Sequence, residues 1–238
     1  MIPKKIHLCW FSPDDYPVDV KKRLESWQLK MPDFETRIWT ASDARSIGCA
    51  YVDQAIDAGF YDAAASVVGF YALYHEGGFY LDCDVEAICR LDRHTPDRGF
   101  TAFIDGSAPG LPLHSSVMIG ERGNRFCGEI IQFYQNRHFK RIDGSPDRLT
   151  ASEVLTRHAA ANGYVADDRC QLLDESTIIL PSKYVVGQSD EVTDDTLAMT
   201  SQLDSWRRKT ARPKGARRLA DAAAQGLHKL RLMFSKSL

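Results

Sequence analysis

The sequence lacks the features of a membrane-spanning, disulfide-stabilised or zinc-binding protein. No stretch approaches the ~18 uncharged apolar residues that a membrane-spanning helix needs. No long apolar run precedes a small-residue cleavage site at the start, so we expect no secretory signal and a cytoplasmic protein. The six cysteines form no close CxxC pair, and the seven histidines show no HExxH or HxH spacing. Reduced thiols and the absence of a zinc site are therefore expected.

What is present is the composition of one soluble domain followed by a basic tail. The chain has 238 residues, 44% hydrophobic and 26% charged, which is ordinary for a globular protein with one substantial core. Its formal charge of −2 is unevenly distributed. Ten Lys or Arg residues and one acid follow Trp206, so the tail carries about +9 and the rest about −11. We predict a folded domain over 1–206 and a basic tail over 207–238.

Strand and helix patterns alternate along this domain. Short apolar runs predict strands near residues 6–11, 36–40, 99–104, 116–119 and 177–180. Helical spacing or composition predicts helices near residues 18–30, 50–60, 62–76, 123–136 and 150–162. Strands that alternate with helices are typical of an α/β fold built on a mainly parallel sheet.

One segment, Gly-Gly-Phe-Tyr-Leu-Asp-Cys-Asp-Val at residues 77–85, carries the chemistry. Its apolar and polar residues alternate, which predicts a strand with Tyr80, Asp82 and Asp84 on one face. Both carboxylates could then reach one cation, and such oxygen ligands suit Mn²⁺ or Mg²⁺ together with substrate phosphates. In open α/β sheets, ligands bind outside the carboxyl ends of strands. Gly78, in the preceding glycine pair, would let a bulky ligand approach the backbone.

An isolated DxD can equally be two solvated acids at a strand end. Here the glycine pair, the aromatic strand and the preceding alanine-rich helix favour a metal–diphosphate site. Asp105, at the end of another predicted strand, could lie on the acceptor side, although Asp-Gly is also a common turn.

This segment resembles the DXD region of a glycosyltransferase family that includes yeast Och1-like mannosyltransferases, bacterial capsular-polysaccharide transferases and, more distantly, the large clostridial glucosylating toxins. The resemblance extends to the opening residues 2–11, to Ser26-Trp27 and to Asp204-Ser-Trp206, so it spans about residues 1–206. It implies a GT-A fold, in which helices flank a Rossmann-like, mixed but mainly parallel nucleotide-binding sheet.

The resemblance also implies an activity. A sugar would move, with retention of anomeric configuration, from a nucleotide-sugar donor to a saccharide or lipid-linked acceptor in cell-surface polysaccharide synthesis. A UDP-sugar is favoured over a GDP-sugar, and the expected cofactor is Mn²⁺ (or Mg²⁺).

Site residues follow from the same resemblance. Trp10 would stack on the nucleotide base, Asp82 would contact the ribose or donor sugar, and Asp84 would bind the metal. Ser205 and Trp206 would close over the diphosphate. Tyr80 shares the face of the aspartates and would line the donor site, although Trp10, Trp206 and Tyr80 could equally be packing residues.

Several positions depart from the family pattern. The family usually has Ser-Asp-x-x-Arg in the helix before the glycine pair, and here Ser66 and Gly69 replace the acid and the base. Ser116 stands where the family has a donor-site Asn, and Thr200 or Ser201 where it has a late His. A glycine in mid-helix costs about 1 kcal/mol relative to alanine, so we expect another group to approach Gly69 closely.

Two other activities remain open at this stage. A degenerate homologue would bind a nucleotide or glycan without turnover, given Ser66 and Gly69. A haloacid-dehalogenase-like phosphatase would use Asp82 as nucleophile and Asp84 as acid, with Lys183 and residues 187–194 as later motifs. In that family, however, the aspartate strand normally opens the domain, whereas here about eighty residues precede it.

The basic tail predicts a location. Apolar residues recur in it at helical spacing among the basic side chains, at Leu219, Ala223, Leu227, Leu230 and Phe234. Such a helix would hold the protein peripherally on the anionic inner face of the cell membrane. The stripe could instead pack on the domain. No nucleic-acid partner is expected, because the rest of the chain is net acidic.

Overall fold

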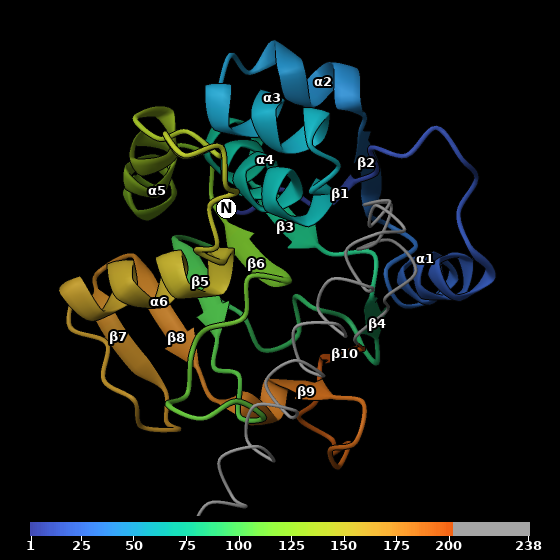
Figure 1. Ribbon diagram of the computed structural model, residues 1–238. Helices are drawn as coiled ribbons and strands as arrows, with labels where there is room; N and C mark the ends of the chain where they lie inside the picture. The colour runs from blue at the N-terminus through green and yellow to red at the C-terminus, as the bar shows by residue number, and fades with distance from the viewer. Residues whose placement is uncertain (202–238) are drawn as a thin grey trace, which may run out of the picture.

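Seven strands form the central sheet of the computed structural model, which describes residues 1–201 (Figure 1). Their order is β2-β1-β3-β6-β5-β8-β7. The strands are β1 (Lys5–Cys9), β2 (Glu35–Trp39), β3 (Gly78–Leu81), β5 (Phe100–Phe103), β6 (Val117–Gly120), β7 (Gln171–Asp174) and β8 (Thr177–Leu180). Only β6 and β7 among these seven run against the others. The expected mixed but mainly parallel α/β sheet is confirmed.

Helices cover both faces of this sheet. They are α1 (Val18–Lys30), α2 (Ala41–Ser46), α3 (Ala50–Asp57), α4 (Tyr61–Glu76), α5 (Arg125–Gln135) and α6 (Ala151–Ala161). Helix α4 packs on β1, β3 and β6, and α3 and α5 pack on α4. Helix α1 lies apart from that group (Figure 1) and belongs to a second hydrophobic cluster. Tyr80 enters the α4 cluster, whereas Phe79 and Leu81 enter the α1 cluster.

A small second sheet completes the described part of the chain. Strand β10 (Ala198–Thr200) lies between β4 (Val85–Ala87), to which it is antiparallel, and β9 (Val185–Gly187). A 3₁₀ turn, η1 (Ser182–Tyr184), precedes β9.

Helix α1 anchors β4 through two side chains. The indole Nε1 of Trp27 donates to the Val85 carbonyl at 2.9 Å, and the Ala87 amide donates to Ser26 Oγ at 2.9 Å. The Ser26-Trp27 pair therefore fixes the strand that follows the two aspartates.

The continuous strand predicted across residues 79–85 is wrong. Strand β3 ends at Leu81, residues 82–85 form a turn, and β4 begins at Val85. The alternation misled because Cys83 and Val85 are buried in the same cluster as the strand residues before them. After Asp82 the chain leaves the central sheet and pairs with β10 instead.

The other predicted elements agree with the structure to within a few residues, but α2, β7, β9 and β10 were not expected. No helix among residues 1–201 is long and apolar enough to cross a membrane. Ser205, Trp206 and the tail over 207–238 lie outside the described residues.

Candidate active site

A cavity of about 680 Å³ opens at the carboxyl edge of the sheet. Asp82 follows the end of β3, Asp105 follows the end of β5, and Ser116 precedes the antiparallel strand β6. All three line the cavity, as do Asp84 and Ser201. This is the edge at which open α/β sheets bind ligands, because the carboxyl ends of the parallel strands meet there.

The aspartate turn is fixed from two sides. Within it, the Val85 amide donates to the Asp82 carbonyl at 3.0 Å. The Asp82 amide donates to the Ser116 carbonyl at 2.9 Å, which ties the turn to β6. Both the amide and Oγ of Ser201 donate to the Asp84 carbonyl at 3.2 Å, which ties it to the end of β10. Asp82 and Asp84 thus reach one cavity from a tight turn rather than from one face of a strand.

Tyr80 holds the carboxylate of Asp82 in place through a hydrogen bond. Its hydroxyl donates to Asp82 Oδ1 at 2.6 Å. Burial, and then the nearby Asp82 charge, raise the pKa of Tyr80 well above its ordinary value, so this hydroxyl stays protonated. Tyr80 is fully buried and is not among the residues that line the cavity. Tyr80 therefore positions the Asp82 carboxylate and does not itself face the cavity.

Gly69 makes room for this tyrosine. A Cβ at position 69 would lie 2.8 Å from Cδ2 and 2.8 Å from Cε2 of Tyr80. Real Cβ atoms essentially never come so close, so only glycine fits in α4 at this point. The close approach predicted at Gly69 is confirmed, and the group that approaches is an aromatic ring of the protein itself.

The two carboxylates fit one class of metal site. No group of three His, Cys, Asp or Glu side chains among residues 1–201 could hold a metal ion. Mg²⁺ and related ions need no such cage, because they commonly bind through one or two carboxylates and take substrate phosphates and waters as further ligands. Asp82 and Asp84 on one cavity therefore match a cation that arrives with a diphosphate, and do not match an all-protein structural metal.

Asp105 and His114 add polar groups to the same cavity. Asp105 Oδ1 accepts from the amide of Ser107 at 3.0 Å and from its Oγ at 2.6 Å, so the Asp-Gly turn interpretation holds as well. His114 Nε2 lies 3.9 Å from Asp105 Oδ1. Burial lowers the pKa of His114 despite the nearby carboxylate, which keeps the imidazole mainly neutral at neutral pH.

Several lining residues were missed from the sequence, namely His114, Ser152 and Gln188. The only signal for His114 was its place in a polar run just before a strand. Ser152 carried none, and Gln188 stood only within residues 187–194, the later motif of the phosphatase alternative. Helix α6 and the loop after β9 reach the cavity only in the folded chain.

Trp10 lies directly after β1, the neighbour of β3, and lines another cavity, of about 530 Å³. Its Nε1 donates to the Asp14 carbonyl at 2.9 Å, and its ring centroid is 4.8 Å from that of Tyr16. An indole held in this way at a cavity wall offers a flat face to a planar ligand.

Two expected donor residues lie elsewhere. Gly78 begins β3, at the opposite end of the strand from Asp82, and a Cβ there would collide with the Lys5 carbonyl. The group that requires this glycine is thus a neighbouring strand, not a ligand. The Ser66 hydroxyl donates to the Asp62 carbonyl at 3.0 Å within α4, and Ser66 does not line the aspartate cavity.

Comparisons with known proteins point to glycosyltransferases. Residues 17–101 match the family model described as "Glycosyltransferase sugar-binding region containing DXD motif". No curated protein matches the chain. Among solved structures, "PaToxG Glycosyltransferase" is similar with a TM-score of 0.55 and 16% identity, over 68% of this chain and 70% of that chain.

Two further solved structures are similar at lower scores. A glycosyltransferase involved in the glycosylation of the major capsid of PBCV-1 has a TM-score of 0.48 and 9% identity, over 82% of this chain and 92% of that chain. An active-site mutant of LgtC has a TM-score of 0.45 and 15% identity, over 93% of this chain and 95% of that chain.

The fold is shared with PaToxG, so the GT-A expectation is confirmed, and the phosphatase alternative finds no support. Over residues 17–101, this chain is thus similar to the DXD-containing sugar-binding region of glycosyltransferases.

Proposed function

We propose that this glycosyltransferase moves a hexosyl group from a UDP-sugar, ahead of a GDP-sugar, to a saccharide or lipid-linked acceptor, with Mn²⁺ or Mg²⁺ at Asp84 and Asp82. One observation carries the proposal: a single turn presents both carboxylates to a cavity of about 680 Å³ at the carboxyl edge of the sheet. Ligand sites commonly have volumes of about 300–1,000 Å³.

Each residue at the cavity has a defined task in this proposal. The bound cation would neutralise charge on the departing diphosphate. Asp84 is 3% exposed, and Ser201 fixes its backbone, so its carboxylate has little freedom to move. Tyr80 orients Asp82 toward the ribose or donor sugar. Trp10 stacks on the nucleotide base in the cavity of about 530 Å³.

The acceptor side is assigned to Asp105 and His114. The neutral imidazole of His114 can accept a proton or donate one, and Asp105 keeps carboxylate lone pairs beyond those used by Ser107. Both could therefore hydrogen-bond an acceptor hydroxyl beside the aspartate turn. Retention of configuration remains part of the proposal through the family resemblance.

Removal of the Asp84 carboxylate tests the proposal. Calorimetric titration with UDP and with GDP, each with and without Mn²⁺, measures donor binding, and transfer assays measure turnover. Asp84→Ala should abolish Mn²⁺-dependent nucleotide binding and turnover, and EDTA should do the same to the wild type. Asp143→Ala removes a turn carboxylate outside the cavity and serves as the matched control.

Sugar transfer by Asp84→Ala at the wild-type rate would contradict the metal assignment. Tighter binding of GDP than of UDP would overturn the donor preference alone. Nucleotide-sugar binding without any hydrolysis or transfer would identify the chain as a non-catalytic homologue.

A peripheral location on the cytoplasmic face of the membrane is a separate proposal. Its support is the sequence pattern of the basic tail, and a lipid-linked acceptor would give the attachment a purpose. Co-sedimentation with phosphatidylglycerol vesicles at low salt tests it. Full-length protein should pellet, and a chain that ends at Trp206 should not. Equally poor pelleting of the two would contradict the membrane proposal.

A further inference from the structure

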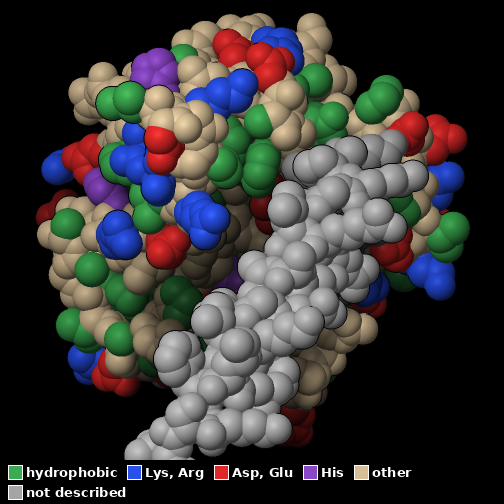
Figure 2. Space-filling model, viewed as in Figure 1, with side chains coloured by type: hydrophobic (Ala, Val, Ile, Leu, Met, Phe, Trp, Pro, Cys, Tyr) green, Lys and Arg blue, Asp and Glu red, His purple; other side chains and the backbone are tan. Residues whose placement is uncertain are grey.

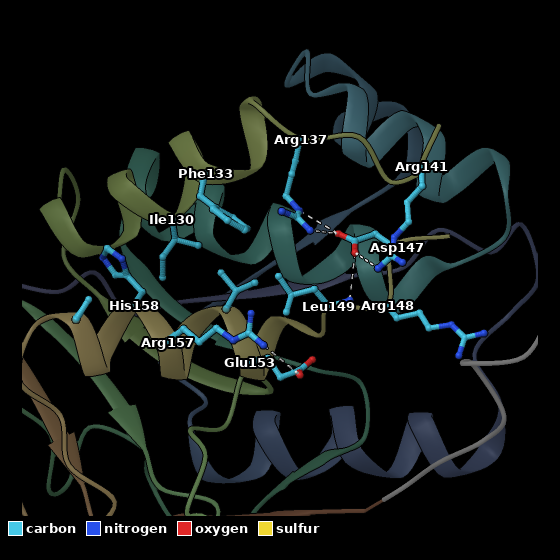
Figure 3. Close-up of a pocket in the computed structure, with 12 residues that line it drawn as sticks. Ile130, Phe133, Arg137, Arg141, Asp147, Arg148, Leu149, Glu153, Arg157 and His158 are labelled. Carbon is cyan, nitrogen blue, oxygen red and sulfur yellow. Dashed lines mark hydrogen bonds and ion pairs between the residues drawn. The ribbon is translucent and has the colours of Figure 1, made fainter. Parts of the chain in front are cut away.

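A second cavity, of about 610 Å³, lies between α5 and α6 (Figure 3). Four arginines line it: Arg137, Arg141, Arg148 and Arg157. Figure 2 shows Lys and Arg side chains gathered on the side of the molecule where α5 and α6 lie. The donor proposal uses none of these residues.

One buried acid organises two of the arginines. Asp147 Oδ2 accepts from Nε and Nη2 of Arg137 at 3.0 and 2.8 Å, and its Oδ1 accepts from Nη2 of Arg141 at 3.3 Å (Figure 3). Burial alone would raise the pKa of Asp147, but the guanidinium groups hold it below its ordinary value. Asp147 is thus ionised, and its carboxylate oxygens already accept hydrogen bonds from Arg137 and Arg141. It therefore orients two guanidinium groups in the cavity wall.

The remaining arginines are more available to a ligand. Arg148 is exposed and forms no ion pair with any residue in 1–201. Arg157 Nη2 lies 3.9 Å from Glu153 Oε1, which is long for an ion pair, and the Arg157 side chain is 71% exposed. With Asp147 and Glu153 as the carboxylates that line the cavity, four arginines leave an excess of two positive charges. His158 adds no charge at neutral pH, because burial lowers its pKa.

The cavity also has an apolar wall. Phe133, Ile130 and Val154 line it, and Phe133 is 39% exposed. Arg137 Cζ lies 4.9 Å from the centroid of that ring, which holds the ring in place from one side. An exposed aromatic face beside guanidinium groups suits a ligand that has both an apolar ring face and an anionic group. A flat basic surface for a nucleic-acid backbone would need no recess of this kind.

Helix α6 separates this cavity from the aspartate cavity. Ser152, in its first turn, lines the aspartate cavity, and the next residue, Glu153, lines the arginine cavity. A short oligosaccharide could therefore have one end at the aspartates and the rest across the start of α6.

We propose that the arginine cavity binds an acidic saccharide, a sugar ring that carries a carboxylate or a phosphate. Its carboxylate or phosphate pairs with Arg148 and Arg157, and its ring lies on Phe133. That this saccharide is the distal part of the acceptor rests on the proposed transferase function, but binding itself does not.

Calorimetric titration of the full-length protein tests the proposal. The probes are a tetrasaccharide of hexuronic acids, a neutral tetrasaccharide, a hexose phosphate and inorganic phosphate. We expect at least one acidic saccharide to bind about 10-fold or more tightly than the neutral one. The double variant Arg148→Gln/Arg157→Gln should weaken that binding by about 10-fold or more, because charge-assisted hydrogen bonds are lost.

Arg125→Gln is the matched control, because this α5 arginine is 82% exposed and does not line the cavity. Equal binding of acidic and neutral saccharides, or equal effects of the control and the double variant, would overturn the proposal. So would inorganic phosphate that binds as tightly as the saccharides, since that result describes a simple anion site. UDP titration with Mn²⁺ on the same proteins reports on the transferase proposal separately, because neither arginine lines the aspartate cavity.

Discussion

Substitution of Gly69 by alanine has two opposing effects on the stability of the fold. Alanine is favoured over glycine in a helix interior by about 1 kcal/mol. Its methyl group would, however, lie 2.8 Å from two ring carbons of Tyr80, well inside the normal contact of about 3.5–4.0 Å. Tyr80 is fully buried and tied to Asp82, so its ring has little space to turn.

The overpacking effect should win. Extra methyl groups in a packed core cost about 1–3 kcal/mol, so the net loss for Gly69→Ala is about 1 kcal/mol. For a chain of this size, that corresponds to a melting temperature lower by about 2–4 °C. Since the ring moves with its hydroxyl, Asp82 should shift as well, and nucleotide affinity with Mn²⁺ should fall. Thermal unfolding and calorimetric titration measure the two effects.

Gly128→Ala in α5 provides the matched control. A Cβ there would approach Tyr74 at 2.9 Å, but Tyr74 is only half-buried and can give way. We expect unchanged or slightly increased stability and unchanged nucleotide binding. In a Tyr80→Leu background, Gly69→Ala should become stabilising. If Gly69→Ala is as stable as the wild type and binds nucleotide equally well, the packing argument fails.

Three further substitutions test the site and the core. Tyr80→Phe removes the hydrogen bond to Asp82 but keeps the ring, so calorimetry should show nucleotide binding weakened by about 10-fold with little change in melting temperature. Trp10→Ala should weaken UDP binding by about 1–3 kcal/mol if the indole stacks on the base, and equal affinity would contradict that role. Burial lowers the pKa of His7, so stability should fall as the pH drops below about 6.5, because the unfolded chain then takes up a proton that the native chain refuses. Urea unfolding of His7→Gln between pH 7 and pH 5 should show a shallower decline, because glutamine takes up no proton in this range.

The sequence predicted the longer elements because each carries its own periodicity. Helix α1 was found in this way, whereas the helix that contains Gly69 was found from its alanine-rich composition and the glycine pair that ends it. The close approach at Gly69 followed from the cost of a glycine in mid-helix. The three-residue strands β9 and β10 were missed because segments so short show no period, and the start of β4 was taken as the end of a longer strand. Strand β10 pairs with β4, more than a hundred positions earlier in the chain, and with β9.

The site, too, could be predicted only where its residues stand in a local sequence pattern. Asp82 and Asp84 stand in a recognisable local pattern, and the structure brings them to one cavity with Ser116. The geometry of their turn depends on Ser201, which no local pattern could reveal. Gly78 was misinterpreted because a glycine in the sequence can indicate a close approach but not which group approaches. Here that group is the backbone of Lys5.

The place of β10 has a consequence for synthesis of the protein. Strand β4, which directly follows the aspartate turn, has β10 as its sheet partner, and the Asp84 carbonyl accepts from a residue 117 positions later in the chain. A nascent chain that already contains every aspartate of the cavity therefore still lacks the strand that holds them. The aspartate turn can therefore be held in place only after Ser201, 117 positions beyond Asp84, has left the ribosome.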